Sequence, residues 1–173
     1  MDPLVPPQSF FYLSDATFLI DIVKSYENTS VEVENVMRFF EFLAKNDIYI
    51  NVPTPIYVEV ISYFYYNMKL STKDTKKKFN ILKNKFYLNI LDYTKNILYN
   101  LLKEINFFDQ NTKCHCGELC LVGHNSGDFC VFITSDENFL KGYNVGYRID
   151  PRIYDNKLGY LFQNSLGEKF YLQ

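Results

Sequence analysis

The sequence predicts an α/β protein in which helices flank a mostly parallel central sheet. Short apolar runs typical of buried strands recur along the chain, and helical segments of about ten residues or more separate them. This alternation favours parallel pairing, because a parallel pair needs a crossover connection that usually contains a helix. With 173 residues, 47% of them hydrophobic, the chain is long enough for one domain with a full core.

The individual elements are predicted from the spacing of apolar residues. Short apolar runs bounded by polar residues predict strands at 10–13, 48–52, 86–91 and 131–133. Apolar residues at three- and four-residue spacing predict helices at 16–25, 33–44, 56–64 and 97–105. A turn at 53–55 places proline at the first position of the helix that follows. Two apolar segments, 160–163 and 169–172, predict a C-terminal β-hairpin.

Charge and hydropathy exclude several classes of protein. The formal net charge is −2, so the molecule as a whole does not attract nucleic acid. No stretch approaches the roughly 18 apolar residues of a membrane span, and the start of the chain, MDPLVPPQ, lacks the basic and apolar regions of a signal peptide. We therefore expect an intracellular, cytoplasmic protein without membrane contact. The four cysteines are then expected as free thiols or metal ligands rather than disulfides.

Four carboxylates follow the predicted strands or lie soon after them. Asp15 follows the first strand, Glu59 lies in the helix after the second, Glu118 lies beyond a cysteine pair, and Asp136 follows the last buried strand. The carboxyl ends of parallel strands open on one crevice, so this fold would gather the four side chains there. Taken singly, an Asp after a strand, such as Asp15 or Asp136, is more often a helix cap or a turn former than a metal ligand. Glu59 has apolar neighbours, so its carboxylate is expected to need a partner such as a cation.

Three segments carry a further pattern: FFYLSDATFL at 10–19, NVPTPIYVE at 51–59 and FITSDENF at 132–139. The first is an apolar strand followed by Asp, the second a proline-containing turn that leads to a helical Glu, and the third a strand followed by Thr, Ser and Asp. Together they resemble the PIN-domain ribonucleases over about residues 10–143. The resemblance implies a three-layer sandwich, with residues 1–143 as a PIN-like nuclease domain and residues 144–173 as a C-terminal extension packed on it.

The resemblance also implies a site and an activity. Thr134 would be a polar support beside a cluster of metal-binding acids, and Asp128 competes for the third acid position, where the family usually has Asp. The cluster would hold one or two Mg²⁺ or Mn²⁺ ions, which prefer oxygen ligands and activate water for attack on a phosphodiester. The implied function is a metal-dependent endoribonuclease acting on single-stranded or looped RNA. A homodimer and an inhibitory or scaffolding protein partner are further expectations. The implied metal ligands are Asp15, Glu59, Glu118 and Asp136.

Two other functions stay open. One is a PIN-like scaffold that binds RNA or protein while its acidic site is idle, because Glu118 departs from the usual Asp. The other is a zinc-stabilised interaction module. Its ligands would be Cys114, Cys116, Cys120 and His124, with Cys130 and His115 as further candidates.

The cysteine-rich segment also predicts a geometry. On a helix, Cys116, Cys120 and His124 would form one stripe, and Glu118 would point roughly 200° away from Cys116, so the thiols and the acid would use opposite faces. A single helix face does not easily surround a tetrahedral ion, so free cysteines buried against the sheet are the simpler expectation. A catalytic Cys–His pair would need a third orienting group, which the sequence does not indicate.

Residues 68–85 form a basic segment that is predicted to be helical and exposed. They hold seven of the 18 lysines and arginines and one acid, Asp74. Lysines of this segment could contact RNA phosphates while nearby aromatic side chains accept unpaired bases. The alternative is a solvated helix face. The predicted RNA contacts are Lys73, Lys76, Lys77 and Lys78.

Overall fold

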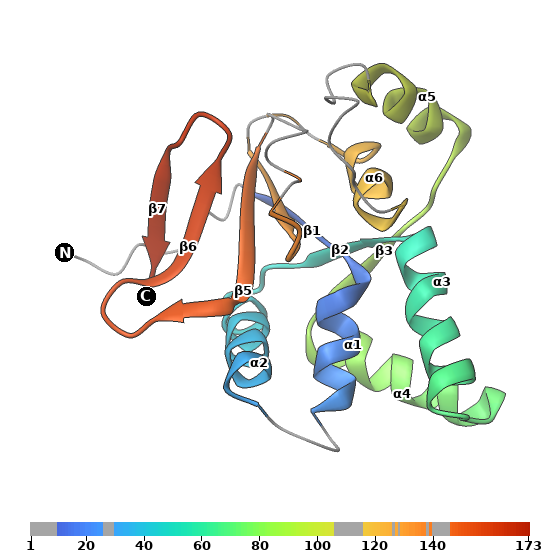
Figure 1. The fold of residues 1–173 in the computed structure, drawn as a ribbon. Coiled ribbons are helices and arrows are strands. Elements are labelled where there is room, and N and C mark those ends of the chain that lie inside the picture. Colours follow the sequence, from blue (N-terminus) through green and yellow to red (C-terminus); the bar gives the residue numbers. More distant parts are fainter. Residues whose placement is uncertain are drawn as a thin grey trace.

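A seven-stranded sheet organises the molecule, in the order β3-β2-β1-β4-β5-β6-β7 (Figure 1). The computed structural model describes residues 10–25, 30–105, 116–125, 127, 129–137, 139 and 146–173. The strands are β1 (Phe11–Ser14), β2 (Ile50–Pro53), β3 (Leu88–Leu91), β4 (Cys130–Ile133), β5 (Tyr147–Asp155), β6 (Gly159–Asn164) and β7 (Lys169–Leu172). The pairs β3–β2, β2–β1, β1–β4 and β4–β5 are parallel, whereas β5–β6 and β6–β7 are antiparallel. The predicted α/β class with a mostly parallel sheet is confirmed.

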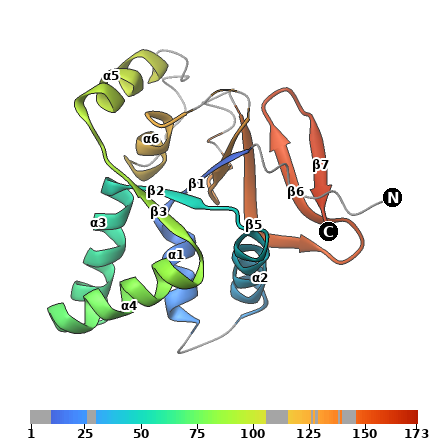
Figure 2. The same ribbon diagram turned by 180° about the vertical axis from the view of Figure 1, so that it is seen from behind.

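Helices lie on both sides of the strands. Figures 1 and 2 both place α5 and α6 on one side of β1 to β3, and α1, α2 and α4 on the other. A π-helical turn, η1 (Tyr63–Asn67), continues α3. The α-helices are α1 (Ala16–Lys24), α2 (Val31–Lys45), α3 (Thr54–Ser62), α4 (Thr72–Lys85), α5 (Lys95–Glu104) and α6 (Cys116–Val122).

Side-chain caps fix where several helices begin. The oxygens of Ser30, Ser71 and Thr94 accept hydrogen bonds from the third backbone N–H beyond them, at 3.3, 3.1 and 3.4 Å. Asp15 caps α1 through the N–H of Thr17, 3.0 Å away. The predicted turn at 53–55 is wrong in one respect, because α3 begins at Thr54 directly after β2.

Aromatic and aliphatic side chains form one core around the sheet. Tyr12 of β1, Phe39 and Phe40 of α2 and Phe132 of β4 are fully buried. The C-terminal strands join this core, since the rings of Phe39 and Tyr160 lie 5.0 Å apart. β5, β6 and β7 therefore extend the same sheet rather than forming a separate layer.

One strand is missing from the sequence prediction, and one correctly predicted helix is more exposed than its pattern indicates. Strand β5 was not predicted, because its segment YRIDPRIYD is rich in charge and contains Pro151, which usually argues against a strand. Helix α5 was predicted from a strongly amphipathic pattern, yet none of its residues is buried, and Leu98 and Leu102 are 45% and 54% exposed. Among the elements that the structure places, α5 packs mainly on the short helix α6, which is too small to cover that face.

A salt bridge ties β5 to α1. The Arg152 guanidinium donates to Asp21 Oδ2 from Nε at 2.8 Å and from Nη2 at 2.6 Å, and it lies over the Phe18 ring at 5.4 Å. The Asp21 side chain is 11% exposed and that of Arg152 is 29% exposed. This two-point contact replaces much of the lost hydration of both groups.

We predict that Arg152→Ala lowers the free energy of unfolding by about 2 kcal/mol, because it leaves the largely buried Asp21 carboxylate without its partner. The matched control is Lys85→Ala, which removes a bridge to Glu41 whose side chains are 38% and 41% exposed. That change should cost less than about 0.5 kcal/mol. Urea unfolding of the three proteins measures both effects, and equal losses would contradict the prediction.

Candidate acidic site

Asp15 lies where strand β1 passes into helix α1. The parallel register pairs Ser14 with Ile133, so the residues that follow, Asp15 and Thr134, emerge side by side from β1 and β4. Asp15 is only 3% exposed, and its Oδ1 accepts the N–H of Thr17. Asp15 Oδ2 is buried, and within the described residues it has no hydrogen bond of ordinary geometry. The Thr134 side chain nevertheless lies near enough to favour the ionised form of the Asp15 carboxyl and so to lower its pKa. The strand pairing thus fixes a buried carboxylate beside a hydroxyl.

Two more acids meet Asp15 at one cavity of about 470 Å³. Helix α6 contributes Glu118, which is 7% exposed, and α3 contributes Glu59. An added Cβ at Gly117 would lie 3.5 Å from Glu59 Oε2, so the Glu59 carboxylate reaches across to α6. Three carboxylates that are far apart in the sequence therefore line the same space.

The electrostatics of this cavity are unfavourable for negative charge. The pKa of Asp15 is raised to about 7, mainly by burial and also by the negative charge of Glu118. The Thr134 hydroxyl and the N–H groups of Thr17 and Phe18 act in the opposite direction. Two carboxyl groups in a poorly hydrated place disfavour simultaneous ionisation. A cation or a proton is needed to relieve this repulsion.

Asp136 belongs to a neighbouring group rather than to the lining of the cavity. Its backbone N–H donates to Thr134 Oγ1 at 3.2 Å, which places it one step from Asp15. Arg148 of β5 lies in the same group: its Nη2 donates to the Ser135 carbonyl at 3.0 Å and lies 3.8 Å from Asp150 Oδ2. Thr134 thus links Asp136 to the acidic cavity.

Arg148 is the functional candidate that the sequence analysis missed. Burial lowers its pKa, while the negative charges of Asp150, Glu137, Asp136 and Asp15 oppose that shift. Arg148 therefore supplies positive charge behind the acids. The alternation of polar and apolar residues in Tyr147-Arg148-Ile149 is typical of a strand and could have indicated Arg148. Pro151, two residues later, argued against a strand in this segment.

The prediction for Glu59 is wrong in its environment. We expected an apolar setting, but Glu59 is exposed, as is its neighbour Val58 at 54%. Only Ile56 and Val60 of this helix are buried, so the side of α3 that carries Glu59 faces outward. Its carboxylate lies at the rim of the cavity and keeps its contact with water. The competing third acid, Asp128, lies outside the described residues.

The expected separation of thiols and acid on α6 is also wrong. Cys116 and Glu118 line the same cavity, because it abuts the amino-terminal turn of α6 rather than one side of the helix. The helix ends at Val122, so His124 does not continue the stripe of Cys116 and Cys120. His124 instead lies against the Tyr93 ring at 5.3 Å, and burial lowers its pKa.

The cysteines differ in exposure. Cys130 is buried as expected of a thiol packed on the sheet, Cys120 is half-buried, and Cys116 is exposed. Burial raises the pKa of Cys120 to about 11, so its thiol is protonated at neutral pH. The zinc candidates Cys114 and His115 lie outside the described part. Within that part, no three His, Cys, Asp or Glu side chains converge closely enough to hold a metal ion.

The lysines predicted to bind RNA all lie on α4. Figures 1 and 2 place α4 across the strands from α6, so these lysines do not border the acidic cavity. Lys78 is half-buried and the others are exposed. Their role as RNA contacts stays a prediction. The four are Lys73, Lys76, Lys77 and Lys78.

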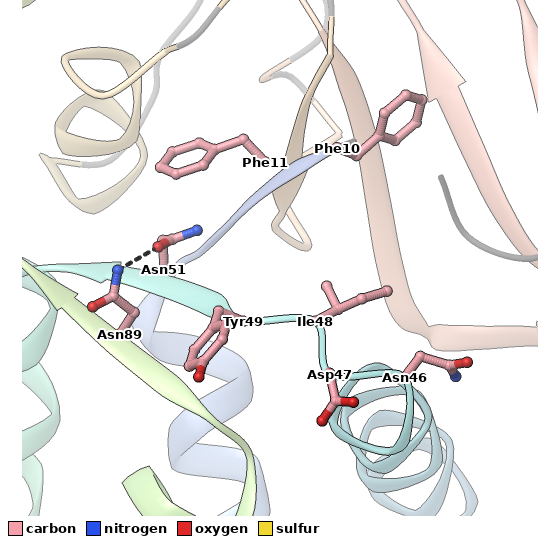
Figure 3. A pocket seen from close by; sticks show the side chains of 8 residues that line it. All are labelled: Phe10, Phe11, Asn46, Asp47, Ile48, Tyr49, Asn51 and Asn89. Atoms are coloured by element: carbon pink, nitrogen blue, oxygen red, sulfur yellow. Dashed lines mark hydrogen bonds between the residues drawn. The ribbon is translucent and has the colours of Figure 1, made fainter. Parts of the chain in front are cut away.

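A larger cavity of about 650 Å³ lies at the other ends of β1 and β2 (Figure 3). Asn89 Nδ2 donates to Asn51 Oδ1 at 2.8 Å, and Asn51 Nδ2 donates to the Tyr12 carbonyl at 3.0 Å. Asp47 is the one carboxylate among its lining residues. It lacks paired acids, so size alone does not identify the site of chemistry.

Comparison of the sequence with known protein families and with curated proteins finds no match. Among the helices that the structure describes, none combines the length and apolarity needed to span a bilayer.

We predict that, without divalent ions, stability falls as pH rises from about 4 to about 7. The pKa of Asp15 in the folded protein lies above its ordinary value of 3.8, so the folded state binds an extra proton in this window. The resulting stabilisation is complete below pH 4 and is lost as pH rises through 7. Asp15→Asn keeps a capping oxygen but cannot ionise. This variant should flatten the slope of stability against pH. Above pH 7 its free energy of unfolding should exceed that of the wild type by on the order of 1–3 kcal/mol.

Urea unfolding in EDTA across this pH range tests the prediction. Glu34→Gln, at an exposed position of α2, removes one carboxylate elsewhere and should leave the slope unchanged. A wild-type slope that persists in Asp15→Asn would show that another group is responsible.

Proposed function

We propose that this protein is a metal-dependent endoribonuclease that hydrolyses phosphodiester bonds in single-stranded or looped RNA. The observation that carries the proposal is the meeting of Asp15 and Glu118 in one cavity, where each raises the cost of ionising the other. The PIN-like segments supply Asp15, Glu59, Thr134 and Asp136, which lie in or next to this cavity. The proposal includes a PIN-like three-layer sandwich that ends in a β-hairpin, β6–β7.

The donor set fits Mg²⁺ or Mn²⁺. These ions are commonly bound by one or two carboxylates and keep several waters. Asp15 and Glu118 would hold the ion, with Glu59 at the rim and Asp136 acting through water. The buried Oδ2 of Asp15 and the raised pKa of this residue are features that a divalent ion would relieve. When bound, such an ion lowers the pKa of a coordinated water and stabilises charge on the phosphodiester.

The residues of the chain prepare the site in three ways. The N–H of Thr17 holds Asp15 Oδ1 and so orients the carboxylate, while the nearby Thr134 side chain favours its charged form. Arg148 offsets part of the negative charge from behind. Glu59 is exposed at the rim, where it can accept a hydrogen bond from an incoming water or hydroxyl group.

One observation favours a second function, a scaffold that binds RNA or protein through an idle acidic site. Among the described residues no three potential ligands converge, so the cavity has a pair of close acids and a more distant third. A pair binds divalent ions more weakly than a larger cluster, because fewer carboxylates offset the cost of dehydrating the ion. The experiment below separates the two functions.

We predict that Mn²⁺ raises the melting temperature of the wild type as expected for a ligand of the folded state alone. Asp15→Asn and Glu118→Gln should lose this response, because each removes a charged ligand. In the same buffer, cleavage of an end-labelled single-stranded RNA should fall at least about 100-fold in both variants and about 10-fold in Glu59→Gln.

Glu34→Gln is the matched control, since it removes an exposed carboxylate of α2 and should retain both responses. RNA binding without cleavage, at any Mn²⁺ concentration, would favour the scaffold. Wild-type cleavage in Asp15→Asn would contradict the assignment of the site.

A further inference from the structure

A separate apolar groove of about 410 Å³ lies between α1 and α4. Its apolar lining comes from Val23 of α1, from Leu70, and from Ile81 and Leu82 of α4. Ile81 is 51% exposed, so an aliphatic side chain of this lysine-rich helix lies in solvent. Leaving this surface in water is unfavourable by roughly 25 cal/mol per Å².

Charged residues border the groove in a definite order. Lys77 and Lys78 line it, and with Asp74, Ile81 and Leu82 they form one stripe of α4 at spacings of three, four, seven and eight residues. No ion pair of Lys77 or Lys78 occurs in the described chain, whose salt bridges involve other residues. The two ammonium groups are therefore available to an anionic partner beside an apolar floor.

The one acid of the stripe is already engaged. Ser71 Oγ donates to Asp74 Oδ2 at 2.6 Å and accepts the Asp74 N–H at 3.1 Å, which forms the cap of α4. Asp74 lies at the first turn, one to two turns before Lys78 and Ile81. A bound segment would thus place its acids toward Lys77 and Lys78 and away from the start of the helix.

We propose that this groove docks an acidic amphipathic helix of a partner protein. Val23 and Leu82 are already buried and form the floor of the groove, so apolar side chains of the partner, at three- and four-residue spacing, would pack mainly on Ile81. The partner's flanking Asp or Glu residues would pair with Lys77 and Lys78. The lining is aliphatic, whereas sites for unpaired nucleic acid use aromatic rings on which bases stack. This favours a protein over RNA as the occupant of this face.

Selection of a displayed library of 16-residue peptides on the full chain tests the proposal. The expected consensus has Leu, Ile or Phe at helical spacing with Asp or Glu between them. The affinity of the selected peptide, measured by fluorescence anisotropy, should fall at least about tenfold in Lys77→Glu/Lys78→Glu and in Ile81→Asp. It should also weaken with added salt.

The matched control is Lys76→Glu/Lys83→Glu, which makes the same charge change about 180–200° around α4 from this stripe. The affinity of this control variant for the selected peptide should stay within about threefold of the wild-type affinity. Circular dichroism and Mn²⁺ thermal shifts of each variant show that the fold and the acidic site are intact, so failure here is separate from failure of the proposed nuclease.

Several outcomes would overturn the proposal. These are a library without binders, a consensus without acids, and equal losses in the two double variants. Binding of a 16-nucleotide oligouridine that depends on Lys77 and Lys78 but not on Ile81 would make the face a nucleic-acid surface. Self-association that Ile81→Asp abolishes, measured by analytical ultracentrifugation, would make the occupant a second copy.

Discussion

The candidate site depends on a buried carboxylate at the junction of β1 and α1. Asp15 cannot move away from its position, because the register of β1 with β4 and the cap of α1 both hold it. Glu118 is then brought toward it by α6, and the cavity between them becomes a place where negative charge is costly. Carboxyl groups with a strongly raised pKa are concentrated at functional sites in proteins, which is why the proposed function is built on this pair.

Strand β5 contributes two positive charges near the acids of α1 and of the candidate site. Two arginines of β5 lie near acids, most of which belong to earlier parts of the chain. Arg152 pairs with Asp21 in the second turn of α1, and Arg148 lies among Asp136, Asp150 and the more distant Asp15. Helix α1 is thus held at its start by the strand register and farther along by an ion pair. A displacement of β5 would disturb both the orientation of α1 and the countercharge of the acids.

Most of the architecture was predictable from the sequence, because the apolar strands β1, β2 and β4 and the periodic helices α1 and α2 each carry a clear pattern. Strand β5 was hidden by Pro151 and by its charges, and Arg148 was therefore overlooked. Glu59 was placed in an apolar setting because sequence neighbours do not show which side of a helix faces water. The geometry at Cys116 and Glu118 depended on where α6 begins, and helix boundaries are the part of a prediction that periodicity determines least well.

The net charge of −2 is the sum of an acidic region and a basic region that lie apart in the fold. Acids converge near α6, whereas α4 carries the densest group of lysines, and the strands lie between them. An RNA phosphate that approaches the acidic cavity meets repulsion, and the lysines across the molecule cannot cancel it beyond a Debye length of about 8 Å in physiological salt. A divalent ion bound in the acidic cavity would make the local electrostatic potential positive there. Under the proposed function, a bound metal ion rather than the basic helix would therefore attract the substrate. The lysines of α4 would then be available to the partner proposed for the apolar groove.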